Sequence, residues 1–334
     1  MSKTLVIAEA GVNHDGNLST AKELIDVAAD CGADLVKFQT FIAEDLVTMD
    51  AMTAKYQKDT ENNSESQYQL LKKLELSQAN HVELVAHSRA RGIEFFSTAF
   101  DFNSIDFLAE LGQKKFKVPS GEITNVPYLR HIASFGFPII MSTGMANLDE
   151  IEIAIHTIEK AGTQRDMITL MHCTSAYPAP MKDLNLTAIV KMREIFRIPV
   201  GYSDHSIGIE ASIAATALGA TVIEKHFTLS KDRSGPDHRT SLEPHELKKM
   251  IEAIRNLDLA LGDGTKALTD SERENVDVVR KSIVACCAIN KGDIFTVANL
   301  TTKRPGTGLS PLLWDELIGS HATQNYDVND LISR

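Results

Sequence analysis

Cysteine is scarce in this chain of 334 residues, which has only four: Cys31, Cys173 and the adjacent pair Cys286 and Cys287. None of them has CxxC spacing, and adjacent cysteines are poorly placed to bridge each other. We therefore expect reduced thiols in apolar surroundings. Disulfide-dependent small folds are excluded, because a chain of this length buries a full core without covalent cross-links.

Long hydrophobic runs and an excess of basic residues are also missing. No stretch approaches the ~20 apolar residues of a membrane span, and the apolar run Leu5 to Ala8 is too short for the core of a signal peptide. The 34 Lys and Arg residues against 45 Asp and Glu give a net charge of −11, which argues against nucleic acid as the main partner. We expect a cytoplasmic protein with no membrane partner, in which a few focused lysines can still bind a small anion.

Short apolar runs alternate with helix-length amphipathic stretches up to about residue 260. This alternation is typical of βα units around a parallel sheet. Eight runs favour a (β/α)8 TIM barrel over a doubly wound sheet, and no G-x-G-x-x-G motif follows the first run. The expected strands are Leu5 to Ala8, Asp34 to Phe38, Glu94 to Thr98, Phe116 to Pro119, Pro138 to Ser142, Ile168 to His172, Pro199 to Ser203 and Val222 to Phe227. The expected helices include Ser19 to Cys31, Gln78 to Arg91, Leu148 to Ala161, Leu184 to Phe196, Ile207 to Leu218 and Pro244 to Leu261.

The pattern changes after Gly264, where a charged stretch of helical period is followed by short β-like runs, Ser282 to Cys286 and Ile294 to Thr296. About 55 residues suffice for a small compact domain. We therefore expect a barrel domain over residues 1–264, a connector over 265–279 and a small β-rich domain over 280–334.

One connection in the barrel pattern is unusually long. Residues Met49 to Leu76 have a middle rich in Asp, Glu, Asn and Ser, and they exceed the length of a plain βα loop. Long loops that are ordered in compact domains commonly carry function. We expect this stretch to be an insertion that covers the substrate.

Polar residues stand at the C-terminal ends of nearly all expected strands, although barrel strands are buried on both faces. Active sites of TIM barrels form at that rim, so polar groups from many strands indicate a catalytic mouth. The residues are Glu9, Lys37, Gln39, Thr98, Lys117, Ser120, Glu122, Ser142, His172, Ser203, His205, Glu224 and His226. Because side chains alternate along a strand, Ser203 shares a face with His205, and Glu224 shares a face with His226.

Two lysines and several hydroxyl groups in this set indicate an anion pocket. Such a pocket would be cationic at two points and lined by hydroxyl donors, which suits phosphate or carboxylate. Its members would be Lys37, Lys117, Thr98, Ser120, Ser142 and Ser203.

The remaining residues of the rim indicate a metal ion and proton transfer. His205 and His226 lie on the last two strands, where adjacent rim positions can reach one ion. Two imidazoles with oxygen ligands suit Mn, Fe or Zn more than Mg or Ca. Glu9 and Glu122 are the candidate acid and base, with the two roles unassigned.

At these residues the sequence resembles the sialic acid synthase family, the phosphoenolpyruvate-dependent nonulosonate synthases. The resemblance runs in order along nearly the whole chain. The motifs are Ala8-Glu9, Asn13-His14, Val36-Lys37-Phe38-Gln39-Thr40, Phe96-Ser97-Thr98, Lys117-Val118-Pro119-Ser120-Gly121-Glu122, Ser142-Thr143-Gly144-Met145, His172-Cys173-Thr174, Tyr177-Pro178, Gly201-Tyr202-Ser203-Asp204-His205-Ser206, Glu224-Lys225-His226-Phe227-Thr228-Leu229, Ser234-Gly235-Pro236-Asp237-His238 and Lys303-Arg304-Pro305-Gly306.

The resemblance implies a barrel followed by a small antifreeze-like (SAF) domain. It also implies condensation of phosphoenolpyruvate with an open-chain N-acetylated hexosamine and water, giving a nine-carbon 2-keto sugar acid and phosphate. We favour N-acetylmannosamine, which gives N-acetylneuraminate. The alternative acceptor is 2,4-diacetamido-2,4,6-trideoxymannose, which gives N,N'-diacetyllegionaminate, because Ser175 is shorter than the Asn found in many family members and leaves room for a second acetamido group.

The resemblance also implies roles for individual residues. Those that would hold phosphoenolpyruvate are Lys37, Thr98, Lys117, Ser120, Ser142 and Ser203. His205 and His226 would bind a divalent metal, with Mn favoured over Mg or Co. Those that would contact the acceptor sugar are Gln39, Asn62, Tyr177, Asp237 and Arg304.

Assembly and two rival functions complete the expectations. The resemblance places Arg304 at a barrel mouth, and a connector that reaches outward would deliver it more readily to a neighbouring barrel than to its own, so we expect a symmetric homodimer with exchanged C-terminal domains. A pyruvate-dependent metal aldolase is the rival enzyme, and phosphate release separates the two. A non-catalytic ice or sugar binder is the rival from another class, and thermal hysteresis would identify ice binding.

Overall fold

A computed structural model describes residues 3–49, 51 and 66–333, and the chain divides into two compact units, Met1–Asp263 and Gly264–Arg334. The strands of the first unit are β1 (Leu5–Gly11), β2 (Leu35–Thr40), β3 (Glu94–Ala99), β4 (Phe116–Val118), β5 (Ile139–Ser142), β6 (Ile168–Cys173), β7 (Val200–Asp204) and β8 (Val222–His226). Its α-helices are α1 (Leu18–Asp30), α2 (Ala43–Leu46), α3 (Gln67–Leu74), α4 (Gln78–Arg91), α5 (Phe102–Glu110), α6 (Val126–Ala133), α7 (Leu148–Ala161), α8 (Ala188–Phe196), α9 (Glu210–Ala217) and α10 (Pro244–Ala260). Its short 3-10 helices are η2 (Ser120–Glu122), η3 (Arg165–Met167), η4 (Met181–Asp183) and η5 (His238–Thr240).

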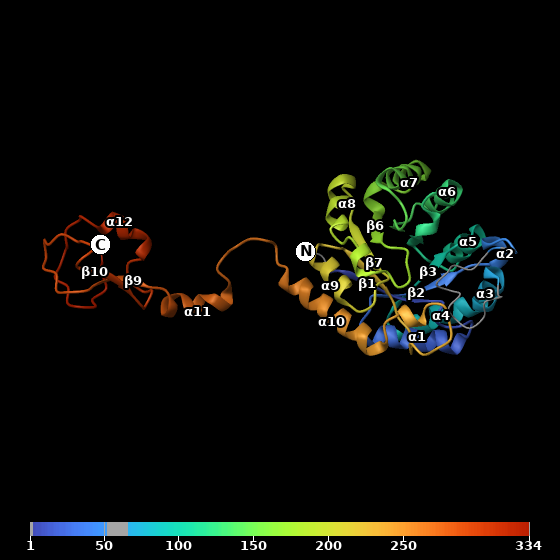
Figure 1. Ribbon diagram of the computed structural model, residues 1–334, viewed down its shortest axis with the longest axis horizontal. Helices are drawn as coiled ribbons and strands as arrows, with labels where there is room; N and C mark the ends of the chain where they lie inside the picture. Colours follow the sequence, from blue (N-terminus) through green and yellow to red (C-terminus); the bar gives the residue numbers. More distant parts are fainter. Residues whose placement is uncertain (1–2, 50, 52–65, 334) are drawn as a thin grey trace. The chain divides into compact units, whose positions relative to one another are not determined.

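The eight strands are parallel and follow the order β3-β2-β1-β8-β7-β6-β5-β4. The strands at the ends of this order, β3 and β4, contact each other. The sheet thus closes into a barrel surrounded by helices (Figure 1), which confirms the expected TIM-barrel fold.

Local sequence signals define where the barrel helices begin and end. Ser77 caps α4 through a reciprocal capping box with Asn80, and Gly92 closes the helix at a φ of 71°, a left-handed conformation that glycine adopts without strain. A second capping box, of Asn147 with Glu150, opens α7. These signals explain why both helices match their expected bounds.

The barrel interior has an apolar layer below a polar one. The apolar layer consists of buried side chains that pack together: Ile7, Leu35, Phe96, Ile140, Met171 and Val222. Two residues further along five of these strands stand Glu9, Lys37, Thr98, Ser142 and Glu224, all buried. Because side chains alternate along a strand, each polar residue faces inward like its apolar predecessor, one step closer to the C-terminal mouth.

The second unit contains α11 (Asp270–Val279), β9 (Ser282–Ala285), β10 (Leu300–Lys303), η6 (Pro311–Leu313) and α12 (Trp314–Leu317). β9 pairs antiparallel with β10, and the unit has its own apolar core around Ile283, Phe295 and Leu300. The expected strand over 294–296 is wrong. Ile294 forms only an isolated bridge to His321 and is half exposed. Of the three residues 294–296, only Phe295 is buried, so this run packs on the core through a single side chain.

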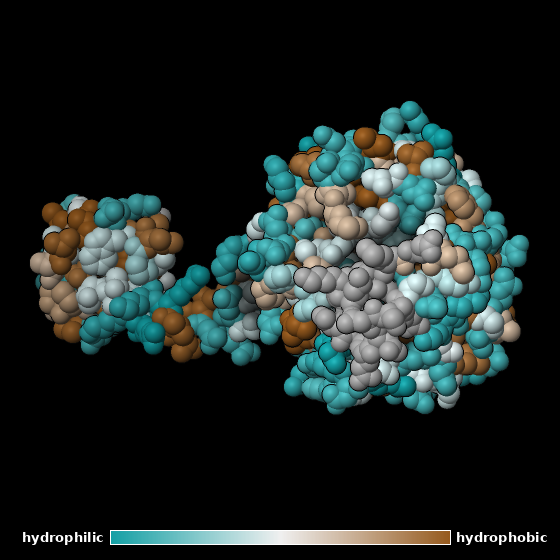
Figure 2. Space-filling model, turned by 45° about the vertical axis from the view of Figure 1, so that its right-hand side comes forward, coloured by the Kyte–Doolittle hydropathy of each residue, from teal (hydrophilic) through white to brown (hydrophobic). Residues whose placement is uncertain are grey.

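The exterior of the protein is largely polar. In the view of Figure 2, hydrophilic residues cover much of the surface and hydrophobic residues form separate small patches. Across the described residues, no helix is long and apolar enough to cross a membrane. The four cysteines are unpaired. The expectation of apolar surroundings is wrong for Cys286 and Cys287, which are exposed.

Candidate active site

A cavity of about 490 Å³ lies at the C-terminal ends of the barrel strands. It collects most of the residues that the sequence analysis singled out. Those residues are Glu9, Lys37, Gln39, Thr98, Lys117, Ser120, Ser142, Tyr177, Ser203, His205, His226 and Asp237. The parallel register brings them together, since Glu9 pairs with Lys37 on one side and with His226 on the other.

Four charged side chains form the floor of this cavity, and all four are buried. Lys37 Nζ lies 2.8 Å from Glu9 Oε2 and 3.6 Å from Glu224 Oε2. Lys117 Nζ lies 4.0 Å from Glu224 Oε1. We call these residues the charged floor. It balances two ammonium groups with two carboxylates, which is the arrangement that buried charge requires.

The two carboxylates of the charged floor are not equivalent. Burial raises the pKa of Glu9 to about 7, against the opposing charge of Lys37. Burial acts in the same direction on Glu224, but Lys117, Lys37 and a hydrogen bond from Ser203 Oγ (2.9 Å) lower the pKa of Glu224 to about 2. Glu224 thus stays ionised near neutral pH, while Glu9 exchanges its proton there.

The lysines are held among hydroxyl groups. Lys37 Nζ donates to Thr98 Oγ1 at 2.9 Å, and Lys117 Nζ donates to Ser142 Oγ at 2.5 Å. Burial lowers the pKa of Lys117, whereas Glu224 and Glu9 outweigh burial at Lys37 and raise the pKa of that residue. A small anion entering here would meet two ammonium groups and several hydroxyl donors in a largely dehydrated site.

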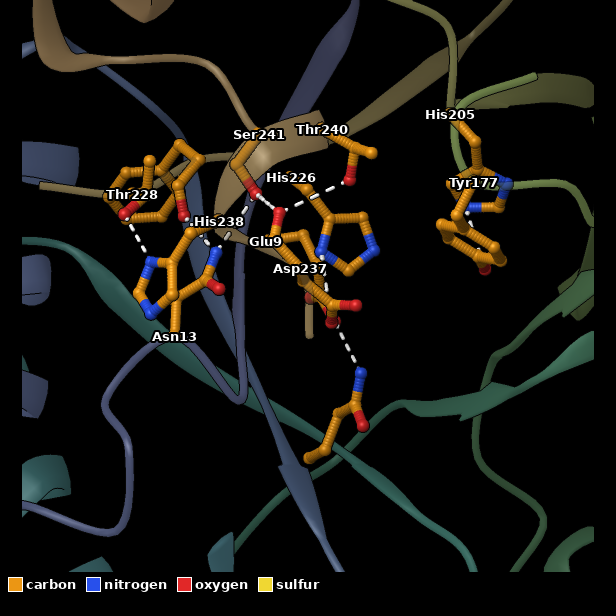
Figure 3. Close-up of polar contacts among 12 residues, drawn as sticks. Glu9, Asn13, Tyr177, His205, His226, Thr228, Asp237, His238, Thr240 and Ser241 are labelled. Carbon is orange, nitrogen blue, oxygen red and sulfur yellow. Dashed lines mark hydrogen bonds and ion pairs between the residues drawn. The ribbon is translucent and has the colours of Figure 1, made fainter. Parts of the chain in front are cut away.

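Two imidazoles stand beside the charged floor, with ring centroids 5.7 Å apart. His205 Nδ1 lies 2.8 Å from the carbonyl oxygen of Thr174, so this nitrogen donates and the Nε2 lone pair is directed away from it, 3.2 Å from Tyr177 Oη. His226 Nδ1 is buried and has no hydrogen-bond partner among the described residues. Asp237 Oδ2 lies 4.0 Å from that nitrogen (Figure 3).

The histidine pair fits a metal ion. Burial lowers the pKa of His205 and, well below its usual value, the pKa of His226, so both rings are neutral and can act as ligands. The unpartnered His226 Nδ1 is a buried lone pair that needs a partner. Within the described part of the chain, no cluster of three or more His, Cys, Asp or Glu side chains is arranged around one metal position. The histidine pair would therefore leave coordination positions to water and substrate.

Three expected sugar contacts also reach the cavity: Gln39, Tyr177 and Asp237. Gln39 Nε2 lies 3.4 Å from Glu9 Oε1. The backbone carbonyl of Asp237 accepts from Ser241 Oγ at 2.6 Å, and Ser241 in turn accepts from Asn13 Nδ2 at 2.9 Å (Figure 3). Burial raises the pKa of Asp237 to about 6.

Among the nominated residues that the structure describes within the first unit, Glu122 alone does not line the cavity. Glu122 lies in η2, half-buried, and accepts from Asn125 Nδ2 at 2.6 Å. Arg304 belongs to the second unit, where its Nε donates to the carbonyl oxygen of Val279 at 3.0 Å. Asn62 lies outside the described residues.

Sequence reasoning missed two parts of the site. The first part is Glu224, for which the sequence predicted a place at the rim but no role. It shares a face with His226, and this spacing indicates that its side chain points into the same cavity. The apolar lining is the second part: the unusual length of the stretch from Met49 to Leu76 indicated that it covers the substrate, but nothing in the sequence indicated that its leucines join Phe41 and Phe100 at the cavity. Its leucines and phenylalanines have the pattern of ordinary core residues.

Comparison with known proteins decides the family. The model of the NeuB family matches residues 24–266, which is most of the chain. The chain belongs to the NeuB family. A relative from Campylobacter jejuni named N,N'-diacetyllegionaminic acid synthase is 54% identical over 99% of both chains. A Legionella pneumophila protein of the same name is 47% identical over 96% of this chain and 90% of its own.

A solved structure extends the comparison to the fold. The crystal structure of an N-acetylneuraminic acid synthetase from Leptospira borgpetersenii, in complex with citrate, is 35% identical with a TM-score of 0.72. It covers 82% of this chain, and the match spans 90% of its own. The family and the enzyme class predicted from the sequence, a phosphoenolpyruvate-dependent synthase that forms a carbon–carbon bond, are thus confirmed.

Proposed function

We propose that the protein condenses phosphoenolpyruvate with 2,4-diacetamido-2,4,6-trideoxymannose and water to form N,N'-diacetyllegionaminate and phosphate. The observation that carries the proposal is the charged floor beside the histidine pair in one cavity. It offers an anion site next to groups that can activate an aldehyde and move a proton.

The choice of acceptor rests on the relatives. Two proteins named for N,N'-diacetyllegionaminic acid are 54% and 47% identical to this chain over nearly their full lengths. They support the diacetamido acceptor over N-acetylmannosamine, which the sequence analysis favoured. N-acetylmannosamine is the second candidate, supported by the Leptospira structure at 35% identity.

In this proposal, residues of the charged floor and its hydroxyl groups bind phosphoenolpyruvate. Lys37 and Lys117 neutralise the phosphate and carboxylate, which lie within reach of Thr98 and Ser142. Ser120 and Ser203 line the same cavity and complete the set of donors. Glu224 stays ionised and balances the lysines when the site is empty.

The reaction forms one carbon–carbon bond and needs three proton transfers. C3 of phosphoenolpyruvate attacks the aldehyde carbon, the new bond forms, and the aldehyde oxygen takes up a proton. Water adds to C2 and loses a proton. The carbon–oxygen bond to phosphate then breaks, and the hydroxyl at C2 gives its proton to the departing phosphate as the keto group forms. Glu9, with a pKa of about 7, suits both donation to the aldehyde oxygen and acceptance from water.

His205 and His226 would hold a divalent metal ion, for which manganese is the favoured identity. When bound, such an ion supplies Lewis-acid polarisation of the acceptor's aldehyde oxygen. The chain's own part is to keep both imidazoles neutral and oriented. The hydrogen bond from His205 Nδ1 to Thr174 does this for one ring.

The proposal also includes the acceptor contacts and the assembly. Gln39, Tyr177 and Asp237 bind the sugar within the cavity, and Asn62 and Arg304 complete the contacts. Arg304 acts on the barrel of a second subunit in a domain-exchanged homodimer, where it helps to exclude water.

An assay with the purified full chain tests the proposal. The protein, phosphoenolpyruvate and Mn are incubated with each sugar, phosphate release is followed, and the product is identified by mass spectrometry. We expect a larger kcat/KM with the diacetamido sugar than with N-acetylmannosamine. The reverse preference would favour N-acetylneuraminate synthesis, and turnover of pyruvate without phosphate release would favour the aldolase.

A further inference from the structure

One side of the active-site cavity is apolar. We call this side the apolar wall, and its residues are Phe41, Leu46, Leu70, Leu71, Leu74 and Phe100. They pack against one another, with Phe41 and Leu74 buried and the rest partly buried. The partly buried members line the cavity, so they offer apolar surface to whatever enters it.

The helix α3 presents a regular face to the cavity. Gln67, Leu70, Leu71 and Leu74 recur at helical spacing and all line the cavity. The intervening Lys72 is exposed and pairs with Glu44 and Glu75 on the outside, at 2.9 Å in each case. The leucines therefore form a continuous face of α3 toward the cavity, within the stretch expected to cover the substrate.

The apolar wall lies beyond the charged floor, toward the outside of the barrel mouth. Lys37 and Thr98 are within β2 and β3, whereas Phe41 and Phe100 follow the ends of these strands. The reacting aldehyde carbon, C1 of the sugar, must meet phosphoenolpyruvate at the charged floor. With C1 held there, an extended open-chain sugar would direct its far end, C6, away from the charged floor and toward the outer part of the mouth, where the apolar wall lies.

The chemistry of the wall distinguishes two classes of sugar. A hydroxymethyl group pressed against leucine and phenylalanine loses water without gaining a hydrogen bond, which is unfavourable. A methyl group at the same position gains from burial. We propose that the apolar wall selects acceptors that carry a methyl group rather than a hydroxymethyl group at C6. This inference rests on the proposed function and deepens it by assigning the residues that recognise the methyl group at C6 of the acceptor.

Two sugars that differ by one oxygen test the inference with the full-length protein. The first is 2,4-diacetamido-2,4,6-trideoxymannose, and the second is the same compound with a hydroxyl at C6. We expect kcat/KM to favour the 6-deoxy sugar by about 10- to 100-fold, the range for an added hydroxyl in an apolar pocket. Equal values would overturn the inference and leave the proposed function intact. Absence of phosphate release with both sugars would overturn the proposed function itself.

Substitutions locate the discrimination in the wall. Leu71→Asn should reduce the preference for the 6-deoxy sugar several-fold, mainly through a higher KM for that sugar. The matched control is Leu259→Asn, because Leu259 lies on α10, is 84% exposed and does not line the cavity. Leu70→Asn provides a second test should the first variant fail to fold. A wild-type preference in the folded Leu70 or Leu71 variants would overturn the assignment.

Discussion

Lys37 Nζ lies 2.8 Å from Glu9 Oε2 inside the barrel, and both side chains are at most 5% exposed. Lys37 is shared with Glu224, 3.6 Å away, so one ammonium group partly neutralises two carboxylates. This sharing is the physical reason why Glu9 keeps a high pKa while Glu224, which also faces Lys117, does not.

Removing the shared ammonium should therefore destabilise the fold. Lys37→Met leaves a buried carboxylate without its closest partner, and we expect a loss of about 3–5 kcal/mol in the free energy of unfolding. Lys22→Met is the matched control, because Lys22 pairs with Glu83 at 2.6 Å on the surface and its loss should cost at most about 1 kcal/mol. Urea denaturation measures both values. Equal small losses would mean that the charged floor is not a compensated cluster.

Glu9 and Glu122 make different predictions for catalysis. Glu9→Gln should lower kcat by about 100- to 10,000-fold, because the amide cannot transfer the proton. Glu122→Gln should stay within a few-fold of wild type, since Glu122 bonds to Asn125 rather than lining the cavity. Steady-state phosphate release measures both variants, with circular dichroism as the control for folding. A large loss in Glu122→Gln alone would restore Glu122 as the catalytic carboxylate.

Metal removal gives a prediction for the histidine pair. Chelation should abolish turnover and added Mn should restore it, and His226→Ala should reduce the rate at least ~100-fold. Binding of Mn by the wild-type protein, measured by calorimetry, should weaken strongly in the same variant. An unchanged melting temperature would show that His226→Ala is folded. Full activity in excess chelator would contradict the assignment.

Asp34 gives a prediction for stability against pH. Burial acts to raise its pKa, but Lys3, the backbone nitrogen of Val6 and Arg255, 2.7 Å away, lower the pKa below its ordinary value of 3.8. The stabilisation is thus fully present above that value and is lost as pH falls through the lowered folded-state pKa. The free energy of unfolding should differ between wild type and Asp34→Asn at neutral pH, and this difference should shrink in acid. If the difference in the free energy of unfolding stayed constant with pH, the stabilisation by Asp34 would not come from its ionised carboxylate.

Mixed subunits test whether Arg304 acts across a dimer. If it does, a dimer of one Arg304→Ala subunit and one His226→Ala subunit has one intact site, and activity should return toward half the wild-type level per mixed dimer. If Arg304 serves its own barrel, every site is defective and no activity returns. Sedimentation supplies the control, since a monomer at micromolar concentration would exclude the exchange.

Much of the fold and part of the site follow from the periodicity of polar and apolar residues in the sequence alone. In β1, Ile7 and Glu9 share the inward face, and the same spacing relates Leu35 to Lys37 in β2. An apolar residue followed two positions later by a polar one, repeated over many strands, therefore predicts both a packed barrel and a polar mouth. Capping residues likewise predict where helices such as α4 begin and end.

The tertiary structure alone decided which polar groups act together and what surrounds them. Glu122 and Glu224 are both carboxylates near a strand end, but η2 turns Glu122 toward Asn125 while β8 points Glu224 at the lysines. The apolar wall joins α3 to residues after β2 and β3, which are separated along the chain. The periodicity of polar and apolar residues shows which face of its own helix or strand a residue occupies. It does not show which other helix or strand that face contacts, because those contacts depend on tertiary packing.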